Sequence, residues 1–149
     1  MEADVIITAT GLQVKMFGGA KVIVDGAEID FSNKIVYKGM MFNDVPNFIY
    51  SAGYTNASWT LRCELTSEWA SRVITHMDKV GAKQFVPVIK SSDKMKIKPM
   101  FDLSSGYITR AQHTMPKQGD KGPWRRHDYP GDLFDFFTGK IADGVLSFK

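Results

Sequence analysis

The sequence of 149 residues predicts an α/β fold. Unbroken apolar runs typical of buried strands lie at residues 4–9 and 48–53, and one long segment repeats its apolar residues with the period of a helix. The composition agrees, because 44% hydrophobic and 23% charged residues are ordinary for a globular chain. The length suits one folded unit, residues 1–149.

The first third of the chain predicts short strands separated by turns. The run at 4–9 has no polar alternation, as in a strand covered on both faces. Asp25-Gly26, between VIV and AEID, favours a two-residue hairpin loop. KIVYKGM (34–40) predicts a further strand, and FIYSAG (48–53) a buried one.

One long helix follows. It should begin at residues 56–59, with Asn56 or Ser58 as the N-cap, and end near Lys79 before a Gly81 C-cap. Its apolar residues recur every four positions and predict a buried face: Leu61, Leu65, Trp69 and Val73.

The remainder, residues 84–149, predicts a long irregular arm. QFVPVIK (84–90) is an expected edge strand because it contains a proline. DLFDFFTG (132–139) predicts a short helix with an aromatic face, and Asp143-Gly144 a closing hairpin. We therefore divide the single unit into residues 1–83 and the arm 84–149.

Charge and cysteine content exclude several classes of function. The formal net charge of +3 is small, and the lysines at 90, 94, 96 and 98 lack interleaved aromatic residues, which favours a solvated loop over a nucleic-acid groove. Cys63 is the only cysteine, so no intramolecular disulfide forms. No membrane span or signal peptide is visible, and we expect a cytoplasmic protein.

The residues offer no catalytic constellation and no metal site. His76, His113 and His127 lack partners at metal-ligand spacing, and no phosphate-cradling glycine loop is present. His76 is expected at the surface, and Cys63 is expected to be an inert core thiol. We assign no catalytic residue.

Two strand-to-turn transitions stand out. Thr10-Gly11 ends the first strand, and Gly53 leads into the cap of the long helix. Open α/β sheets place ligands at such strand ends, where a helix N-terminus offers N–H donors. The alternative is that these glycines only permit tight turns.

Longer stretches resemble a known family. DVIITATGL (4–12) is similar to the ATG segment of flavin-containing and Baeyer–Villiger monooxygenases, where the chain passes from the NADP-binding to the FAD-binding domain. ATGLQVKMFGGA, then YKGMMFNDVPNFIYSAGYTNASWTLRCELTSEW, then MPKQGDKGPWR resemble the C-terminal portion of the ethionamide-activating type. The similarity covers residues 3–149.

The resemblance implies the remnant of a two-nucleotide-fold flavoprotein, part of the FAD-binding domain plus the irregular arm. The parent enzyme would use FAD and NADPH to insert one oxygen atom of dioxygen into a ketone or onto a sulfide. The GxGxxG loop for FAD is absent from this sequence, so the N-terminal nucleotide-binding portion is an expected partner. The chain alone is expected to be inactive and to bind FAD weakly.

The resemblance also implies site residues. Thr10 and Gly11 match the ATG turn near both cofactors, and Trp124 falls where relatives place an aromatic near nicotinamide and substrate. Arg125 and Arg126 would assist NADP or, as we favour, only solubilise the surface. The turn before the helix, facing the flavin pyrimidine edge, comprises Gly53, Thr55, Asn56, Ala57 and Ser58.

Two rival interpretations remain. One is a non-catalytic fragment or a subunit that needs a separate upstream chain. The other is a related flavin enzyme such as an N-hydroxylase, against which YTNASWTL and MPKQG weigh. In either case the unpaired edge of strand 4–9 predicts self-association.

Overall fold

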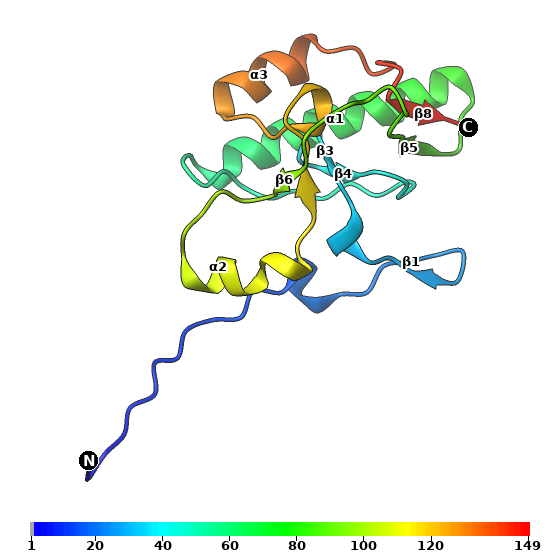
Figure 1. Ribbon diagram of the computed structural model, residues 1–149. Helices are drawn as coiled ribbons and strands as arrows, with labels where there is room; N and C mark the ends of the chain where they lie inside the picture. Colours follow the sequence, from blue (N-terminus) through cyan, green and yellow to red (C-terminus); the bar gives the residue numbers. More distant parts are fainter. Residues whose placement is uncertain (1) are drawn as a thin grey trace.

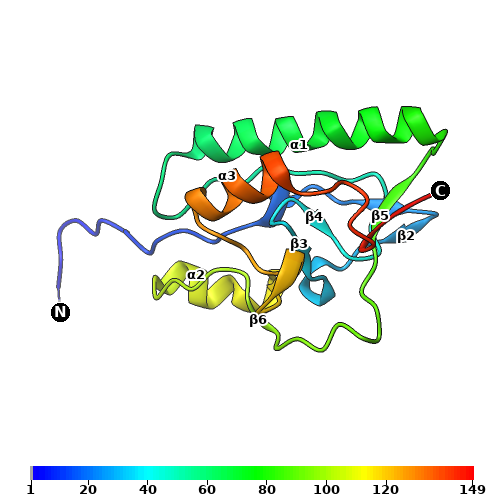
Figure 2. The same cartoon turned by 90° about the horizontal axis from the view of Figure 1, so that it is seen from above.

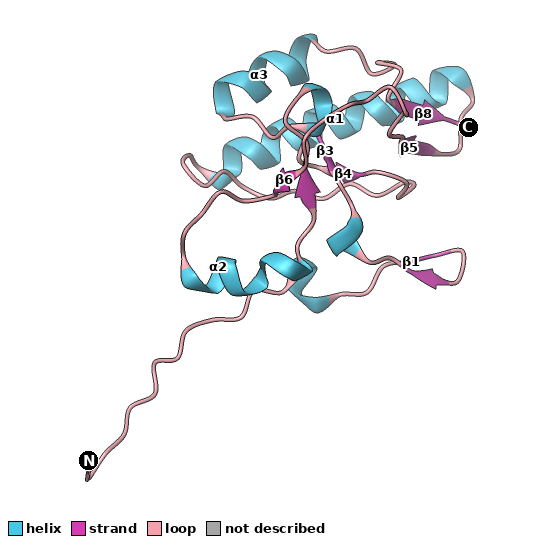
Figure 3. Ribbon diagram, viewed as in Figure 1, coloured by secondary structure: helices cyan, strands magenta, loops and turns pink. Residues whose placement is uncertain are grey.

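The computed structural model describes residues 2–149. Residues 2–149 form three α-helices, short 3-10 turns and small two-stranded ladders. Figures 1 and 3 show how these elements are arranged. The helices are α1 (Trp59–Val80), α2 (Gly106–Ala111) and α3 (Tyr129–Thr138). The 3-10 turns are Met16–Gly19, Phe31–Asn33, Gln112–Thr114 and Gly122–Trp124. The strands are β1 (Ile23–Val24), β2 (Ala27–Glu28), β3 (Val36–Tyr37), β4 (Met41–Phe42), β5 (Phe85–Pro87), β6 (Lys98–Pro99), β7 (Lys117–Gln118) and β8 (Leu146–Phe148).

Helix α1 confirms the predicted long helix. Ser58 is its N-cap residue, and Gly81 closes it in the left-handed conformation (φ 73°), which glycine adopts without a Cβ penalty. The expected apolar stripe is buried at Leu65, Trp69 and Val73. The local periodicity and the C-cap therefore define this element.

Cys63 and His76 differ from the expectation. Cys63 is exposed, because it precedes Leu65 by two residues and so lies roughly 200° around the helix from it. His76 is half-buried, with its ring 4.6 Å from that of Phe148. The thiol is thus a surface group, and the imidazole packs against the C-terminal strand.

One hairpin forms where turn chemistry predicts it, and the turn of a second lies within the strand predicted at 34–40. β1 and β2 pair across Asp25 (φ 51°) and Gly26 (φ 83°), the positive angles of a type I′ turn. β3 pairs with β4 across a loop containing Lys38 and Gly39, also at positive φ. The strand predicted at 34–40 is confirmed only over Val36–Tyr37.

The predicted strand at 4–9 is wrong. The segment is extended and leaves the body of the molecule (Figures 1 and 2), with Val5, Ile6 and Ile7 exposed by 77%, 79% and 88%. A strand needs ladder partners and covered faces, and within residues 2–149 no segment pairs with this one.

The predicted strand at 48–53 is also wrong. Tyr50 donates its backbone N–H to the Met40 carbonyl (2.9 Å), but no ladder forms among the described residues. The aromatic side chains pack instead: Tyr50 stacks on Phe42 with ring centroids 4.8 Å apart, and Phe48 lies beside Phe17. The segment is apolar as expected, but within residues 2–149 its backbone has no neighbouring strand.

The C-terminal arm returns to the body. β5 pairs with β8, which confirms the strand expected at 84–90 and replaces the closing hairpin. Asp143 accepts from the backbone N–H of Val145 (2.8 Å) and of Leu146 (2.9 Å), so this turn redirects the chain into β8 rather than folding it back on itself.

Helix α3 begins three residues before the predicted 132–139 and packs on α1 (Figure 2). Phe136 is buried against Trp69, at 5.6 Å between ring centroids, whereas Phe134 and Phe137 are exposed. Of the predicted aromatic face, only Phe136 packs into the core.

The main buried cluster combines both parts of the chain. Tyr37, Trp69, Phe85, Trp124 and Leu146 belong to it, from both sides of the predicted 83/84 division. That division remains a prediction. Across residues 2–149, no helix is both long and apolar enough to cross a membrane.

Candidate functional site

The turn that precedes α1 is shaped by close packing at Gly53. Gly53 and Tyr54 are buried, whereas the residues that follow are exposed up to the helix. A methyl group at Gly53 would overlap the indole of Trp59. Glycine is therefore required for the Trp59 ring to lie against the backbone of this turn.

The N-terminus of α1 lacks side-chain capping. The Ser58 hydroxyl contacts Thr60 Oγ1 (2.8 Å), and within the described chain it bonds to no backbone N–H of the helix. The first turn contains no acidic residue. This end of a 22-residue helix keeps its positive partial charge and free donors, and it can accept an electron-rich atom.

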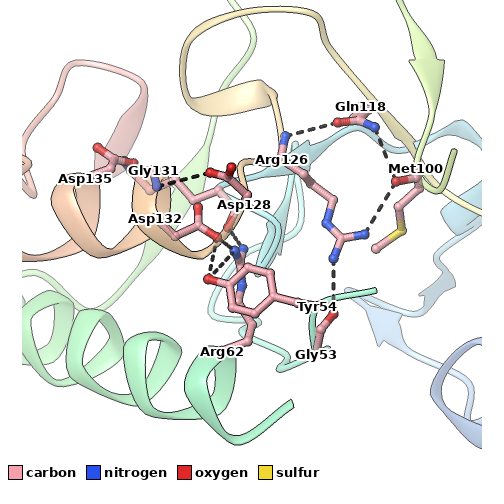
Figure 4. Close-up of polar contacts among 11 residues, drawn as sticks. Gly53, Tyr54, Arg62, Met100, Gln118, Arg126, Asp128, Gly131, Asp132 and Asp135 are labelled. Atoms are coloured by element: carbon pink, nitrogen blue, oxygen red, sulfur yellow. Dashed lines mark hydrogen bonds and ion pairs between the residues drawn. The ribbon is translucent and has the colours of Figure 1, made fainter. Parts of the chain in front are cut away.

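A buried ion pair joins α1 to α3, and a hydrogen bond joins the turn to the same carboxylate (Figure 4). Arg62 is fully buried, pairs with Asp132 and donates to the Lys38 carbonyl. The Tyr54 hydroxyl donates to Asp132 Oδ2 at 2.7 Å. Burial lowers the pKa of Arg62 to about 10, so its guanidinium stays charged at neutral pH against this carboxylate.

Arg126 lies close to Arg62. A methyl group at Gly39 would overlap Arg62 Nη2 and lie 3.3 Å from Arg126 Nε. Arg126 donates to the carbonyls of Met100 and Gly53, at 3.4 Å each (Figure 4), and its guanidinium lies 4.9 Å from the Phe101 ring centroid. Burial lowers the pKa of Arg126. The expectation of a merely solubilising arginine is wrong here, because carbonyls and an aromatic ring enclose the side chain.

Arg125 is exposed, as expected. His127 borders the same region, and burial is the main cause that lowers its pKa. Neighbours along the chain thus differ in environment: Trp124 is buried, Arg125 is exposed, and Arg126 and His127 are half-buried.

The predicted site residues border several hollows. Gly53 and Thr55 line a groove of about 740 Å³ that includes Trp59. Thr55 and Asn56 line a hollow of about 210 Å³ that includes Arg126. Ala57 and Ser58 are exposed at the helix start.

Thr10 and Gly11 line a different hollow, of about 570 Å³. It adjoins the groove of Gly53, because Val14, Met16 and Tyr107 border both. The two predicted strand ends therefore meet adjoining hollows rather than one site.

Trp124 lies apart from these hollows. Its side chain is 3% exposed and packs edge-on against Tyr37, with ring centroids 5.7 Å apart. It is part of the main core, and its predicted place beside nicotinamide and substrate stays a prediction.

Sequence reasoning missed the Arg62–Asp132 pair. Arg62 lies within the apolar stripe, three residues before Leu65 and seven before Trp69. An arginine at such a position is a signal of a buried partner. Its partner lies 70 positions further along the chain and could not be identified from spacing.

Comparison with known proteins gives sequence relatives only. No family model matches the chain, and no solved structure matches it. The chain is 42% identical to "FAD-containing monooxygenase EthA" of Mycobacterium tuberculosis, 40% to the protein of the same name in Mycolicibacterium smegmatis and 38% to "Probable FAD-binding monooxygenase AlmA" of Acinetobacter baylyi.

Each match covers 99% of this chain but only 30% of the relative. The chain therefore spans less than a third of the length of these curated relatives. In sequence, it corresponds to the C-terminal part of FAD-containing monooxygenases of the EthA type.

Proposed function

We propose that this chain is part of an FAD- and NADPH-dependent monooxygenase that inserts one oxygen atom of dioxygen into ketones or onto sulfides. The observation that carries the proposal is the identity of about 40% over nearly the whole chain. The fold would then be the remnant of a two-nucleotide-fold flavoprotein, acting in the cytoplasm.

The α1 N-terminus fits a flavin. Free helix N–H groups in a first turn that contains no acidic residue suit the electron-rich pyrimidine edge, and Thr55 and Asn56 add polar groups beside them. When bound, FAD would supply the redox chemistry of oxygen transfer. The chain's own residues would orient the ring through the turn Gly53–Ser58.

The remaining predicted residues have supporting roles in this proposal. Thr10 and Gly11 would approach both cofactors from the adjoining hollow. The Trp59 ring and the groove that it lines would exclude water from the same region. We assign no acid–base role to any residue of this chain.

The alternative is a non-catalytic fragment, or a subunit that functions with a separate chain carrying the N-terminal nucleotide-binding portion. The observation that favours it is the limited span of the match, 30% of each relative. Purified residues 1–149 with FAD and NADPH should then retain little flavin and oxidise no NADPH.

A chimera tests the proposal. Residues 1–149 replace the matching 30% of EthA from Mycobacterium tuberculosis. We expect the chimera to retain FAD through gel filtration and to oxidise NADPH faster with a ketone or sulfide present. Ala57→Asp, which places a carboxylate at the helix N-terminus, should weaken flavin retention.

The controls separate the alternatives. Lys149→Asp changes charge at the far end of the chain and should leave flavin retention unchanged. A folded chimera without flavin would contradict the proposal. Oxidation stimulated by an amine instead of a ketone or sulfide would favour an N-hydroxylase.

A further inference from the structure

Arg126 is a half-buried cation whose Nε is fully buried, and none of the described acidic residues pairs with it. The ion pairs of the described residues are Lys21–Glu28, Lys38–Asp135 and Arg62–Asp132, and none includes Arg126. Its two hydrogen bonds to carbonyls are long, and within residues 2–149 its Nε finds no partner. Even partial removal of a charge from water is costly unless an opposite charge compensates it.

The guanidinium borders a hollow of about 620 Å³. Lys98 and Arg125 line the same hollow, so three cationic residues border it. Two carboxylates, Asp102 and Asp120, also border it, but Asp120 Oδ1 already accepts the Lys96 backbone N–H at 2.9 Å. The lining is therefore cationic on balance.

The smaller hollow on the turn side of Arg126 is less suitable. Asp102 and Asp128 line it, and Arg126 is its only arginine or lysine among the described lining residues. An anion would meet two carboxylates there against one guanidinium. The larger hollow is the better anion site.

We propose that the hollow formed by Lys98, Arg125 and Arg126 binds an oxyanion, the phosphate or carboxylate group of a small ligand. The planar guanidinium matches two oxygens of such a group bidentately. The long bonds to the Met100 and Gly53 carbonyls are weak competitors. This inference uses only residues of this chain and does not depend on the proposed monooxygenase activity.

Gln118 holds the site in shape. Its Oε1 accepts the Arg126 backbone N–H (3.0 Å), and its Nε2 donates to the Pro99 carbonyl (2.9 Å). Because these bonds fix the backbone on both sides, the guanidinium is positioned before a ligand arrives.

Purified residues 1–149 are titrated with inorganic phosphate and, separately, with acetate, at ionic strength held constant with sodium chloride. NMR follows the Arg126 Nε–H and the Gln118 side-chain amide. We expect saturable shifts of both signals with at least one anion. The tighter of the two arms identifies phosphate or carboxylate as the ligand group.

Two variants test Arg126 itself. Arg126→Gln should weaken binding about tenfold or more, and Arg126→Lys should weaken it less because the charge remains but the fork is lost. Arg110→Gln, a matched loss of an exposed arginine that borders another hollow, should change affinity by less than about twofold.

Three results would overturn the proposal: equal loss in the Arg126 and Arg110 variants, shifts that chloride reproduces, or no shift at Arg126 in the wild-type chain. If Arg126→Gln fails to fold, the wild-type titration still decides, because the Arg126 signal reports contact directly.

Discussion

Arg62 is fully buried and Arg126 is half-buried, and the two guanidinium groups have different partners. Arg62 has a carboxylate, a carbonyl and the Tyr54 hydroxyl within reach, although its Nε makes no hydrogen bond to the described residues. Arg126 has only carbonyls and the Phe101 ring. The first is a structural pair, and the second leaves charge for a ligand.

Removing the Asp132 carboxylate should strongly destabilise the fold. Asp132→Ala leaves the Arg62 charge buried without compensation, and we expect a loss of about 3–5 kcal/mol in the free energy of unfolding, measured by urea denaturation. Glu28→Ala is the control, because Glu28 and its partner Lys21 are both exposed and the loss of their ion pair should cost less. Equal losses in the two variants would contradict the structural role of the buried pair.

Two tyrosine hydroxyls provide a matched comparison. Tyr54→Phe removes the donor to Asp132 and should lower the free energy of unfolding by about 1–3 kcal/mol. Tyr50→Phe should be neutral or stabilising, because the Tyr50 hydroxyl is buried and bonds to none of residues 2–149. Thermal or urea unfolding measures the stability of both variants. A destabilised Tyr50→Phe variant would show that this hydroxyl has a partner.

Tyr50 also predicts loss of stability in alkali. Burial raises its pKa to about 12, while the unfolded chain loses this proton near its ordinary value of about 10. The stability from the neutral phenol is therefore complete below pH about 10 and is lost as the pH rises toward 12. Urea unfolding from about pH 9 to 11 should show a steeper decline for wild type than for Tyr50→Phe. Tyr107→Phe, at an exposed position, should retain the wild-type slope.

The helix ends differ in their capping. Asp128 caps α3 by accepting the Gly131 backbone N–H at 3.2 Å, whereas Ser58 makes no such bond to α1 within the described chain. Helix α1 depends on its buried stripe, and the shorter α3 depends more on its cap.

This contrast gives an element-scale prediction. Asp128→Ala should lower the free energy of unfolding by about 1 kcal/mol, and Ser58→Ala by only a few tenths. Both are measured by urea denaturation at one pH. A larger loss for Ser58→Ala would mean that its hydroxyl caps the helix in solution.

Elements with local signals could be predicted from the sequence. The α1 stripe, the Gly81 cap and the Asp25-Gly26 loop are each determined by residues within the element itself. The runs at 4–9 and 48–53 do not, because a strand exists only beside another strand, and here no described segment takes that place.

The candidate site likewise has one feature that the sequence predicts and others that it does not. The turn at Gly53 could be located, since glycine before a helix cap is a local signal. The environments of Arg62 and Arg126 could not be predicted. They depend on Asp132 and Met100, which are distant in sequence and reach the arginines only through the packing of α3 and the arm.

Across the whole molecule, the two ends of the chain behave differently. The C-terminus is tied down, because the backbone N–H groups of Lys83 and Gln84 donate to the Lys149 carbonyl at 2.6 and 2.9 Å. The N-terminal segment extends from the body (Figure 1). Its contact with the arm includes Arg110, which donates to the Leu12 carbonyl at 3.4 Å.

The exposed N-terminal segment should make the isolated chain associate with itself. Three consecutive β-branched residues, Val5, Ile6 and Ile7, combine free backbone groups with apolar side chains, which favours strand pairing between copies. Sedimentation analysis of purified residues 1–149 should show a concentration-dependent oligomer. Ile6→Lys should weaken the association about tenfold or more, because a charge must then be desolvated at the paired edge. Val80→Lys, which changes an exposed apolar residue at the far end of α1, is the matched control and should associate like wild type. A monomeric wild-type chain, or equal weakening by both substitutions, would exclude pairing through this segment.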